Sequence, residues 1–249
     1  MTMAGVCLQM DVGNSSAKWR VVESGVVVAR GSYLTGDELS REELFASVEV
    51  LGQIWVASVA AVPAETELTR MLVEKWGVQP WYARTPARAN GLENSYTDPG
   101  RMGVDRWLAM LAARDFVAGR FCVVDAGSAL TIDIVDERGL HEGGYIIPGP
   151  GLMERALLLD TDRVRFEESA EYQLSPGKST AEAVRHGIAV AQAGAVRMVL
   201  DEMKISETQL LICGGGGVTL QALLSGAGRQ VPDLVFDGLA LMAGRESDE

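Results

Sequence analysis

Alternating apolar and polar residues mark two stretches of the chain that lie about half its length apart. The first, residues 6–33, predicts three strands, with a polar turn after the first of them. The second, residues 121–134, has an apolar run, an Asp-Ala-Gly-Ser turn and a second alternating run. Asp11 and Asp125 occupy the same place in the two patterns, each just before a glycine-containing turn. Two copies of one hairpin predict a duplicated domain with a cleft between its halves.

The rest of the chain alternates between strand-like and helical patterns. The predicted strands are 53–59, 78–82, 141–147, 209–213 and 231–235, and the predicted helices are 63–76, 107–116, 152–159, 180–203, 218–224 and 237–243. Residues 84–103, rich in Pro, Gly, Asn and Asp, predict a long loop of the kind that often carries function. Hairpins at the start of each half, followed by helices, favour an α/β fold with mixed sheets over an all-parallel one.

Composition and charge narrow the function classes. A chain of 249 residues is long enough for two compact domains. The formal net charge of −12 argues against a nucleic-acid partner, because phosphate backbones require clustered Lys and Arg, but it leaves nucleotide binding open. The start of the chain lacks the basic and apolar regions of a signal peptide, and the longest uncharged window, residues 208–228, is too rich in glycine to span a membrane. We therefore expect no nucleic-acid and no membrane partner.

The cysteines and histidines show no spacing typical of a metal site or a nucleophile. Cys7, Cys122 and Cys213 each lie in an apolar, strand-like run without a CxxC pattern, which predicts buried thiols in a reducing cytoplasm rather than disulfides or metal ligands. His141 and His186 have no partner at a suitable spacing, and we interpret both as structural.

The turn after the first strand has the chemistry of a phosphate-binding loop. The backbone amides of residues 13–16 can cradle the β- and γ-phosphates of a nucleotide, Asp11 can hold Mg²⁺ directly or through water, and Lys18 adds positive charge. The alternative is a plain hairpin turn, because Asp, Gly, Asn and Ser are common in turns. The repetition of the pattern at residues 125–128 favours the functional interpretation.

Four short motifs follow one another along the chain: DVGNS at 11–15, GVDR at 103–106, DAGSA at 125–129 and GGYIIPG at 143–149. Together they resemble the DxGNT, GxDR, DxGTA and GGxIxPG motifs of the type III pantothenate kinases. This family is a branch of the superfamily of acetate and sugar kinases, heat-shock ATPases and actin. The resemblance covers essentially the whole chain, and the ordered set is specific although each motif alone is weak. Ser15 and Ser128 replace the family's usual Thr but keep the hydroxyl, so we expect altered packing around the nucleotide rather than lost activity.

The resemblance implies two ribonuclease-H-like domains, as in the actin-like ATPases, with mixed sheets flanked by helices; we assign them to residues 1–118 and 119–249. It implies ATP-dependent phosphorylation of pantothenate to 4′-phosphopantothenate, the first step of coenzyme A biosynthesis, in the cytoplasm. It also implies a homodimer with active sites near the subunit interface. Two alternatives stay open: another small-molecule kinase of the superfamily, and a non-catalytic ATP-binding regulator like the Bvg accessory factors.

The resemblance also implies roles for individual residues. Asp105 is the proton acceptor for the pantothenate hydroxyl; from the sequence alone it could equally be a helix-start acid, stabilised by about 0.3–1 kcal/mol through the helix dipole. Arg106 binds the pantothenate carboxylate, and Asp125 binds a monovalent cation, K⁺ or NH₄⁺. Further contacts to pantothenate are assigned to Tyr96, Gly103, Val104 and Thr180, and contacts to ATP and its Mg²⁺ to Asp11, Val12, Gly13, Asn14, Ser15, Ser16, Ala17, Lys18 and Ser128. Asp105 distinguishes a kinase from a non-catalytic ATP-binding protein, because a pure binding protein needs no base there.

Overall fold

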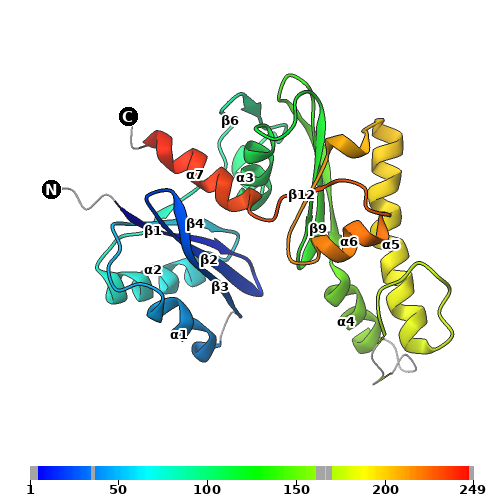
Figure 1. The fold of residues 1–249 in the computed structure, drawn as a ribbon, viewed down its shortest axis with the longest axis horizontal. Helices are drawn as coiled ribbons and strands as arrows, with labels where there is room; N and C mark the ends of the chain where they lie inside the picture. Colours follow the sequence, from blue (N-terminus) through cyan, green and yellow to red (C-terminus); the bar gives the residue numbers. More distant parts are fainter. Residues whose placement is uncertain (1–4, 35–36, 161–165, 167–169, 247–249) are drawn as a thin grey trace. The chain divides into compact units, whose positions relative to one another are not determined.

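The computed structural model describes residues 5–34, 37–160, 166 and 170–246 of the chain (Figure 1). The chain forms two compact units. The first takes in the chain up to Ala87, the segment Tyr96–Ala112 and the chain from Val235 onward, and the second takes in Arg88–Ser95 and Ala113–Leu234. The chain therefore passes between the units several times. The division into domains 1–118 and 119–249 stays a prediction.

The first unit is built on a five-stranded mixed sheet with the strand order β3-β2-β1-β4-β5. Its strands are β1 (Val6–Val12), β2 (Ser16–Glu23), β3 (Val26–Leu34), β4 (Gln53–Ser58) and β5 (Trp81–Tyr82). The first three are antiparallel neighbours, as the alternating pattern predicted, whereas β4 runs parallel to β1 and β5 runs parallel to β4. The carboxyl ends of β1, β4 and β5 therefore lie at one end of this sheet, and so does the polar turn between β1 and β2.

Helices cover both faces of the first sheet. They are α1 (Glu38–Ala46), α2 (Val62–Trp76), α3 (Val104–Ala113) and α7 (Leu234–Glu246). One face packs against α1 and α2, through buried apolar residues that include Leu8, Met10, Trp19, Val21, Leu44, Ile54, Val56, Leu68 and Leu72. As predicted, α2 has Pro63 in its first turn, and it ends at Gly77, whose φ of 70° suits glycine.

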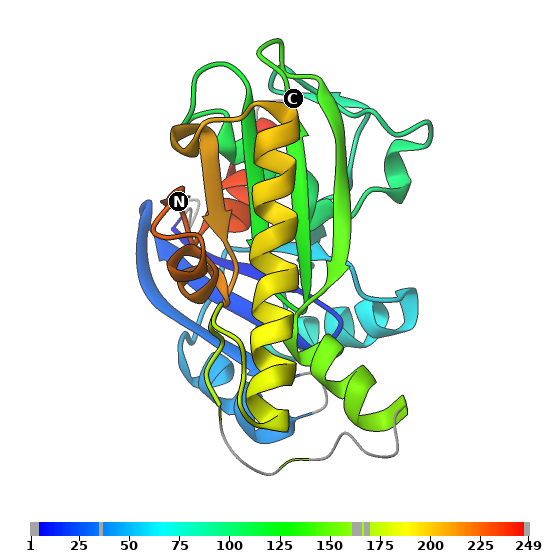
Figure 2. The ribbon, with the colours of Figure 1, turned by 90° about the vertical axis from the view of Figure 1, so that its right-hand side faces the viewer.

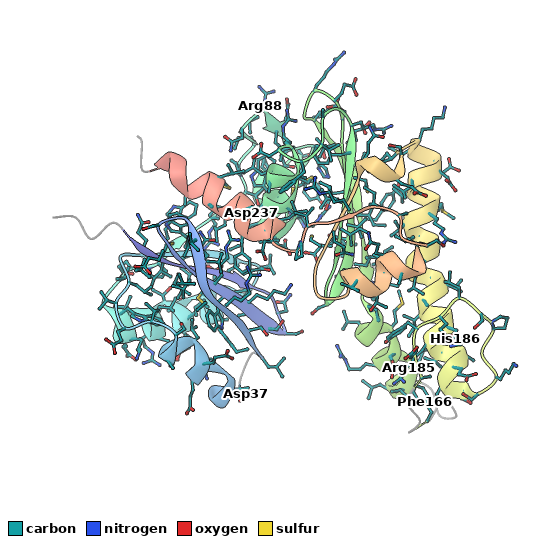
Figure 3. All side chains as sticks on the ribbon, in the orientation of Figure 1. Asp37, Arg88, Phe166, Arg185, His186 and Asp237 are labelled. Carbon is teal, nitrogen blue, oxygen red and sulfur yellow. The ribbon has the colours of Figure 1, made fainter. Side chains whose placement is uncertain are left out.

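The last helix of the chain, α7, packs on the opposite face of the same sheet. Arg20 of β2 is buried there; its Nε donates to Gln9 Oε1 at 2.7 Å and its Nη2 donates to Asp237 Oδ1 at 3.1 Å (Asp237 is labelled in Figure 3). A Cβ on Gly238 would collide with the backbone of Leu108, so α7 and α3 pack closely. Charge-assisted hydrogen bonds and this close contact place the end of the chain in the first unit.

The second unit repeats the architecture of the first. Its five-stranded sheet has the order β10-β9-β8-β11-β12, with strands β8 (Phe121–Ala126), β9 (Ala129–Val135), β10 (His141–Pro148), β11 (Leu210–Cys213) and β12 (Arg229–Gln230). The first three strands are again antiparallel neighbours, and β11 and β12 continue the sheet in parallel with β8. The equal order and direction of the strands in both sheets agree with the predicted duplication.

The described part of the second unit contains the α-helices α4 (Pro150–Asp160), α5 (Thr180–Met203) and α6 (Gly217–Leu223). The long helix α5 lies along one face of the sheet (Figure 2). The core on this face is made of buried apolar residues from the sheet, α5 and α6, among them Cys122, Val124, Leu130, Ile132, Ile134, Ala193, Val196, Leu200, Ile212 and Leu220.

Several predicted bounds differ from the structure: the strand predicted at 78–82 is only Trp81–Tyr82, and the helix predicted at 107–116 runs from Val104 to Ala113. Two other segments differ more. The strand predicted at residues 231–235 is wrong: β12 ends at Gln230 and α7 already begins at Leu234. Pro232 has no N–H to donate to a sheet, and Asp233 is a residue type favoured just before a helix, so the apolar pattern there was misread. The predicted loop at 84–103 also contains two short paired strands, β6 (Arg88–Ala89) and β7 (Leu92–Glu93), and a 3₁₀ turn.

The described ranges contain neither a metal-ligating cluster nor a membrane span. Among those residues no group of three or more His, Cys, Asp and Glu side chains could hold a metal ion, and no helix is long and apolar enough to cross a membrane. The three cysteines are buried thiols. Burial raises the pKa of Cys7 to about 12 and also raises the pKa of Cys122, so neither thiol is a nucleophile at neutral pH.

Candidate active site

The turn between β1 and β2 is a polar loop at the carboxyl end of β1. The amide of Gly13 donates to the carbonyl of Ser16 at 3.0 Å, which closes the turn. A Cβ on Gly13 would lie only 3.3 Å from that carbonyl oxygen, so glycine suits this tight closure. Asn14 and Ser15, at the tip, are exposed. The loop thus offers hydroxyl and amide groups to a ligand.

Asp11 and Lys18 stand opposite each other in the β1–β2 ladder. Successive residues of a strand point to opposite faces, so both lie on the face that carries Gln9 and Arg20, away from the core under α1 and α2. Both side chains are partly exposed. A carboxylate and an ammonium group therefore flank the base of the polar turn.

The start of α3 lies at the same end of the sheet. The amide of Val59, just after β4, donates to the carbonyl of Val12 at 3.0 Å. A Cβ on Gly103, just before α3, would lie 3.7 Å from Val59 Cγ1 and 2.5 Å from Asp105 Oδ1. Only glycine leaves room for the carboxylate in its present position. The GVDR motif and the first polar turn, which are far apart in sequence, are thus brought to one end of one sheet.

Asp105 lies in the first turn of α3 and is partly exposed. Its Oδ1 accepts a hydrogen bond from the backbone amide of Arg106 at 2.8 Å. Amides and the dipole at a helix start favour an ionised carboxylate. The carboxylate is therefore held as a helix-start acid, and it is also accessible at the end of the sheet where the polar turn lies.

Arg106 and Tyr96, both predicted to contact the substrate, are brought together. Arg106 Nη1 donates to the Tyr96 hydroxyl at 2.9 Å, and the guanidinium carbon lies 5.8 Å from the centre of the tyrosine ring. Arg106 is only 6% exposed, so its guanidinium is held in place by its surroundings. A buried, oriented fork of donors beside a phenol is well suited to a carboxylate ligand.

The polar turn of the second unit is also closed by a backbone hydrogen bond from its glycine, but it is one residue shorter than the first. The amide of Gly127 donates to the carbonyl of Ala129 at 2.9 Å, and the amide of Gly149 donates to the carbonyl of Ser128 at 3.0 Å. A Cβ on Gly149 would lie 2.5 Å from that Ser128 oxygen. The Ser128 side chain is exposed. The last glycine of the fourth motif therefore supports the turn that carries Ser128, a role that the sequence reasoning missed although the motif had marked the residue.

The glycine run after β11 packs against the other side of this turn. The amide of Gly216 donates to the carbonyl of Ala126 at 2.8 Å. Gly214 has a φ of 84°, and a Cβ there would collide with Asp125 Oδ1. The two parallel strands β8 and β11 thus end in two backbone turns that meet around Asp125. Such a surface of backbone atoms lets a flat ligand approach closely.

Thr180 is the first residue of α5, and its side chain is exposed. The N-cap is Ser179, whose side chain accepts from the amide of Glu182 at 3.2 Å, so Thr180 begins the helix rather than capping it. Arg185 (labelled in Figure 3), one turn further on, donates to Glu154 of α4 at 3.0 and 3.2 Å, and this bonding raises the pKa of Arg185. These contacts fix the helix start that presents Thr180.

The burial and the hydrogen bond of His186 agree with the prediction that it is a structural residue. Its side chain is buried, and its Nδ1 lies 2.6 Å from the carbonyl oxygen of Ser175, to which it donates (Figure 3 labels His186). The charged stretch 160–178, whose sequence indicates a surface loop, lies partly outside the described residues.

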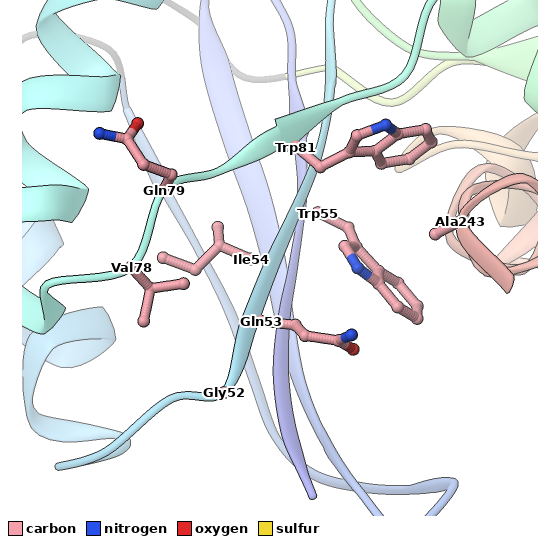
Figure 4. Close-up of a pocket in the computed structure, with 8 residues that line it drawn as sticks. All are labelled: Gly52, Gln53, Ile54, Trp55, Val78, Gln79, Trp81 and Ala243. Atoms are coloured by element: carbon pink, nitrogen blue, oxygen red, sulfur yellow. The ribbon is translucent and has the colours of Figure 1, made fainter. Parts of the chain in front are cut away.

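The first unit also contains a cavity of about 260 Å³, which lies away from the predicted site residues of that unit (Figure 4). It is lined by Gly52, Gln53, Ile54, Trp55, Val78, Gln79, Trp81 and Ala243. Gly52 and Gln53 are at the amino end of β4, whereas Val59 follows its carboxyl end, so this cavity is at the opposite end of the sheet from Asp105. It contains none of the predicted site residues.

The predicted site residues form two sets. The first unit holds residues 11–18, Tyr96 and residues 103–106, and the second unit holds Asp125, Ser128 and Thr180. Each unit thus carries one polar turn at the carboxyl end of its first strand, with an acidic residue at the base of the turn. Two ribonuclease-H-like mixed sheets with the same strand order, each carrying such a turn, define a protein of the actin-like ATPase fold.

Solved structures of similar fold support this class. A Campylobacter jejuni protein described as a Baf family transcriptional activator matches with a TM-score of 0.61 at 19% identity, over 97% of this chain and 100% of that one. A Sinorhizobium meliloti protein described as a 2-dehydro-3-deoxygalactonokinase matches with a TM-score of 0.56 at 15% identity, over 96% of both chains. At these identities the likeness shows the fold, and it confirms the predicted fold class.

Sequence relatives give the family. The family model for type III pantothenate kinase matches residues 7–202. The type III pantothenate kinase of Hahella chejuensis is 36% identical over 238 residues, covering 95% of this chain and 96% of the relative. That of Alcanivorax borkumensis is 37% identical over 245 residues, covering 96% and 99%. The chain belongs to the type III pantothenate kinase family, which confirms the resemblance seen in the four motifs.

Proposed function

We propose that this chain transfers the terminal phosphoryl group of ATP to the terminal hydroxyl of pantothenate, with Asp105 as the residue that accepts the hydroxyl proton. Membership of the type III pantothenate kinase family supports the reaction, the first step of coenzyme A biosynthesis, and with it the use of ATP and a divalent metal ion. The residue roles rest on the geometry of each unit.

The observation that carries the assignment of Asp105 is its support from two sides. The amide of Arg106 bonds one carboxylate oxygen, and the absence of a side chain at Gly103 leaves the space that this oxygen fills. A base for an attacking alcohol must lie within hydrogen-bond reach of the hydroxyl and keep a fixed orientation. A carboxylate held in this way, partly exposed and at the end of the sheet with the polar turn, meets the second requirement before substrate arrives.

ATP is assigned to the two polar turns. The amides and hydroxyls of residues 13–16 would hold the β- and γ-phosphates, with Lys18 adding charge, and Ser128 would contact ATP from the second turn. Asp11 suits Mg²⁺ because this ion is typically held by one or two carboxylates together with phosphate oxygens and water. When bound, the ion would neutralise charge on the transferring group. Asp125, enclosed by backbone turns, is assigned to a monovalent cation, K⁺ or NH₄⁺.

We assign pantothenate to the loop that carries Tyr96 and to the start of α3. Its carboxylate would bind the Arg106 guanidinium, which is buried and already oriented by Tyr96. Gly103 and Val104 would line the approach to Asp105, and Thr180 would contribute its exposed hydroxyl. Preorganised donors limit the entropy lost when the substrate binds.

A homodimer is part of the proposal, and an exposed face of α5 supports it. Gly187, Val190, Ala191, Gly194 and Met198 follow one another at helical spacing, and all are exposed, Val190 by 52% and Met198 by 67%. Small and apolar residues along one side of a helix allow close approach of a second helix. We assign this face to a second copy of the chain. We place the protein in the cytoplasm, where buried thiols stay reduced.

Pantothenate-dependent ADP release tests the reaction. The protein is mixed with ATP, Mg²⁺ and K⁺, and release is measured with pantothenate, with a sugar, with acetate and with no acceptor. We expect release with pantothenate alone. Release with a sugar or acetate at a comparable rate would favour another small-molecule kinase, and ATP binding without release under any condition would favour a regulator.

A further inference from the structure

A chain of hydrogen bonds in the second unit joins the side chains of Ser95, His141 and Asp133, none of which was a predicted site residue. Ser95 Oγ lies 2.9 Å from His141 Nδ1, and His141 Nε2 lies 3.0 Å from Asp133 Oδ1. His141 is 0% and Asp133 2% exposed, whereas Ser95 is exposed. In the neutral imidazole these bonds fix the tautomer: Nε2–H donates to the carboxylate, and Nδ1 accepts from the hydroxyl. The histidine thus bridges the interior of the unit and its surface.

A β-bulge in the edge strand β10 creates this bridge. From Pro148 back to Gly143 the register with β9 is regular, but His141 pairs with Val135, so one extra residue is inserted between His141 and Gly143. Because side chains alternate between faces, that insertion moves His141 onto the face of Asp133. Gly144, directly opposite Asp133, has no side chain to fill the space beside the carboxylate. A regular strand would have pointed the imidazole to the other face.

Ser95 is the end of a segment whose backbone is bonded to the turn between β9 and β10. The amide of Glu93 donates to the carbonyl of Gly139 at 2.9 Å, and Leu92 is 1% exposed. The chain leaves the second unit directly after Ser95, and Tyr96 already belongs to the first unit. Ser95 is therefore the last anchor before the tyrosine that bonds Arg106.

We propose that Ser95, His141 and Asp133 form a positioning network that fixes the backbone at Tyr96 and so sets the affinity for the carboxylate of pantothenate. The substrate part of this inference rests on the proposed roles of Tyr96 and Arg106. None of the three residues is a catalytic residue here. The imidazole is fully buried, and its two ring nitrogens link the Ser95 hydroxyl to the Asp133 carboxylate.

Ser95→Ala is the most selective test, because the exposed hydroxyl can be removed while the His141–Asp133 pair stays intact. Loss of one hydrogen bond raises the KM for pantothenate about three- to tenfold, while kcat and the KM for ATP stay within about twofold. Ser95→Thr, which keeps a hydroxyl, restores the parental KM. Thr97→Ala, which removes an exposed hydroxyl on the other side of Tyr96, leaves the KM unchanged.

Hydrogen–deuterium exchange decides the anchoring independently of activity. In Ser95→Ala, the amides of residues 94–97 exchange about three- to tenfold faster than in the parental protein. Unchanged exchange there would overturn the network, whatever the KM does. A lower melting temperature with unchanged KM and exchange would also overturn it, because the bond would then be purely structural. If Tyr96→Phe leaves the KM for pantothenate unchanged, the proposed role of Tyr96 fails, while the exchange result still decides whether the network holds the loop.

Discussion

The Gly103→Ala variant tests whether catalysis depends on the position of the Asp105 carboxylate, because it displaces the carboxylate without removing it. The new Cβ would lie 2.5 Å from Asp105 Oδ1, whereas the nearest other neighbour, Val59 Cγ1, is 3.7 Å away. Ordinary contact needs about 3.5 Å, so the carboxylate must move by about 1 Å. It is the far end of a side chain, and it can move at a cost of about 0.5–1.5 kcal/mol through an off-rotamer torsion.

Activity should respond far more than stability. A displacement of about 1 Å at a catalytic group typically costs up to about 100-fold in rate, so we expect kcat to fall by about 10- to 100-fold. The melting temperature should change by no more than about 4 °C, because the torsional cost is partly offset by the smaller entropy of the unfolded alanine variant. Steady-state ADP release and thermal unfolding measure the two effects on the same preparation.

Gly244→Ala is the matched control. A Cβ there, in α7, meets nothing within 4 Å, so kcat should stay at the parental value and stability should rise by up to about 1 kcal/mol. A Gly103→Ala variant with parental kcat would refute the reasoning, since Asp105 would then need no fixed position. A variant that melts far below the parental protein would refute it differently, by showing that Gly103 supports the fold.

Three further outcomes follow from the structure. Arg106→Lys should raise the KM for pantothenate about tenfold or more without changing the KM for ATP, because lysine lacks the planar fork; Arg101→Lys, at an exposed arginine, should change neither. Val190→Glu should convert the proposed dimer to a monomer in light scattering at micromolar protein, whereas Val218→Glu, at an exposed valine of α6, should not; a parental mass for Val190→Glu would exclude this face of α5. Cys7 should resist iodoacetamide at pH 8 until the protein unfolds, since a pKa raised to about 12 keeps the thiol protonated at that pH; alkylation of the folded protein at the rate of an ordinary thiol, followed by mass spectrometry, would contradict its burial.

The local parts of the fold were predictable because they depend on neighbours in sequence. The three strands up to residue 34 follow from short apolar and partly alternating runs, and α2 follows from its apolar spacing and from Pro63 at its start. The polar turns were visible as repeated motifs. The same alternation misled at residues 231–235, where Pro232 and Asp233 should have outweighed a short apolar run.

Contacts between distant residues could not be predicted in this way. Arg20 and Asp237, which bring α7 to the first sheet, are 217 positions apart. The bond between Ser95 and His141 spans 46 positions and depends on a bulge that no period in the sequence reveals. The site residues were identified by their resemblance to a family, because one sequence shows which groups are present but not which of them meet.

Pantothenate-dependent turnover of the Asp105→Asn variant tests the central claim most directly. Asparagine keeps the size and the acceptor oxygen that bonds the Arg106 amide but cannot take up the hydroxyl proton. We predict that kcat falls by at least about 100-fold while the affinity for ATP, measured by calorimetry, stays at the parental value. ADP release from Asp105→Asn at the parental rate would contradict the assignment of Asp105 as the proton acceptor.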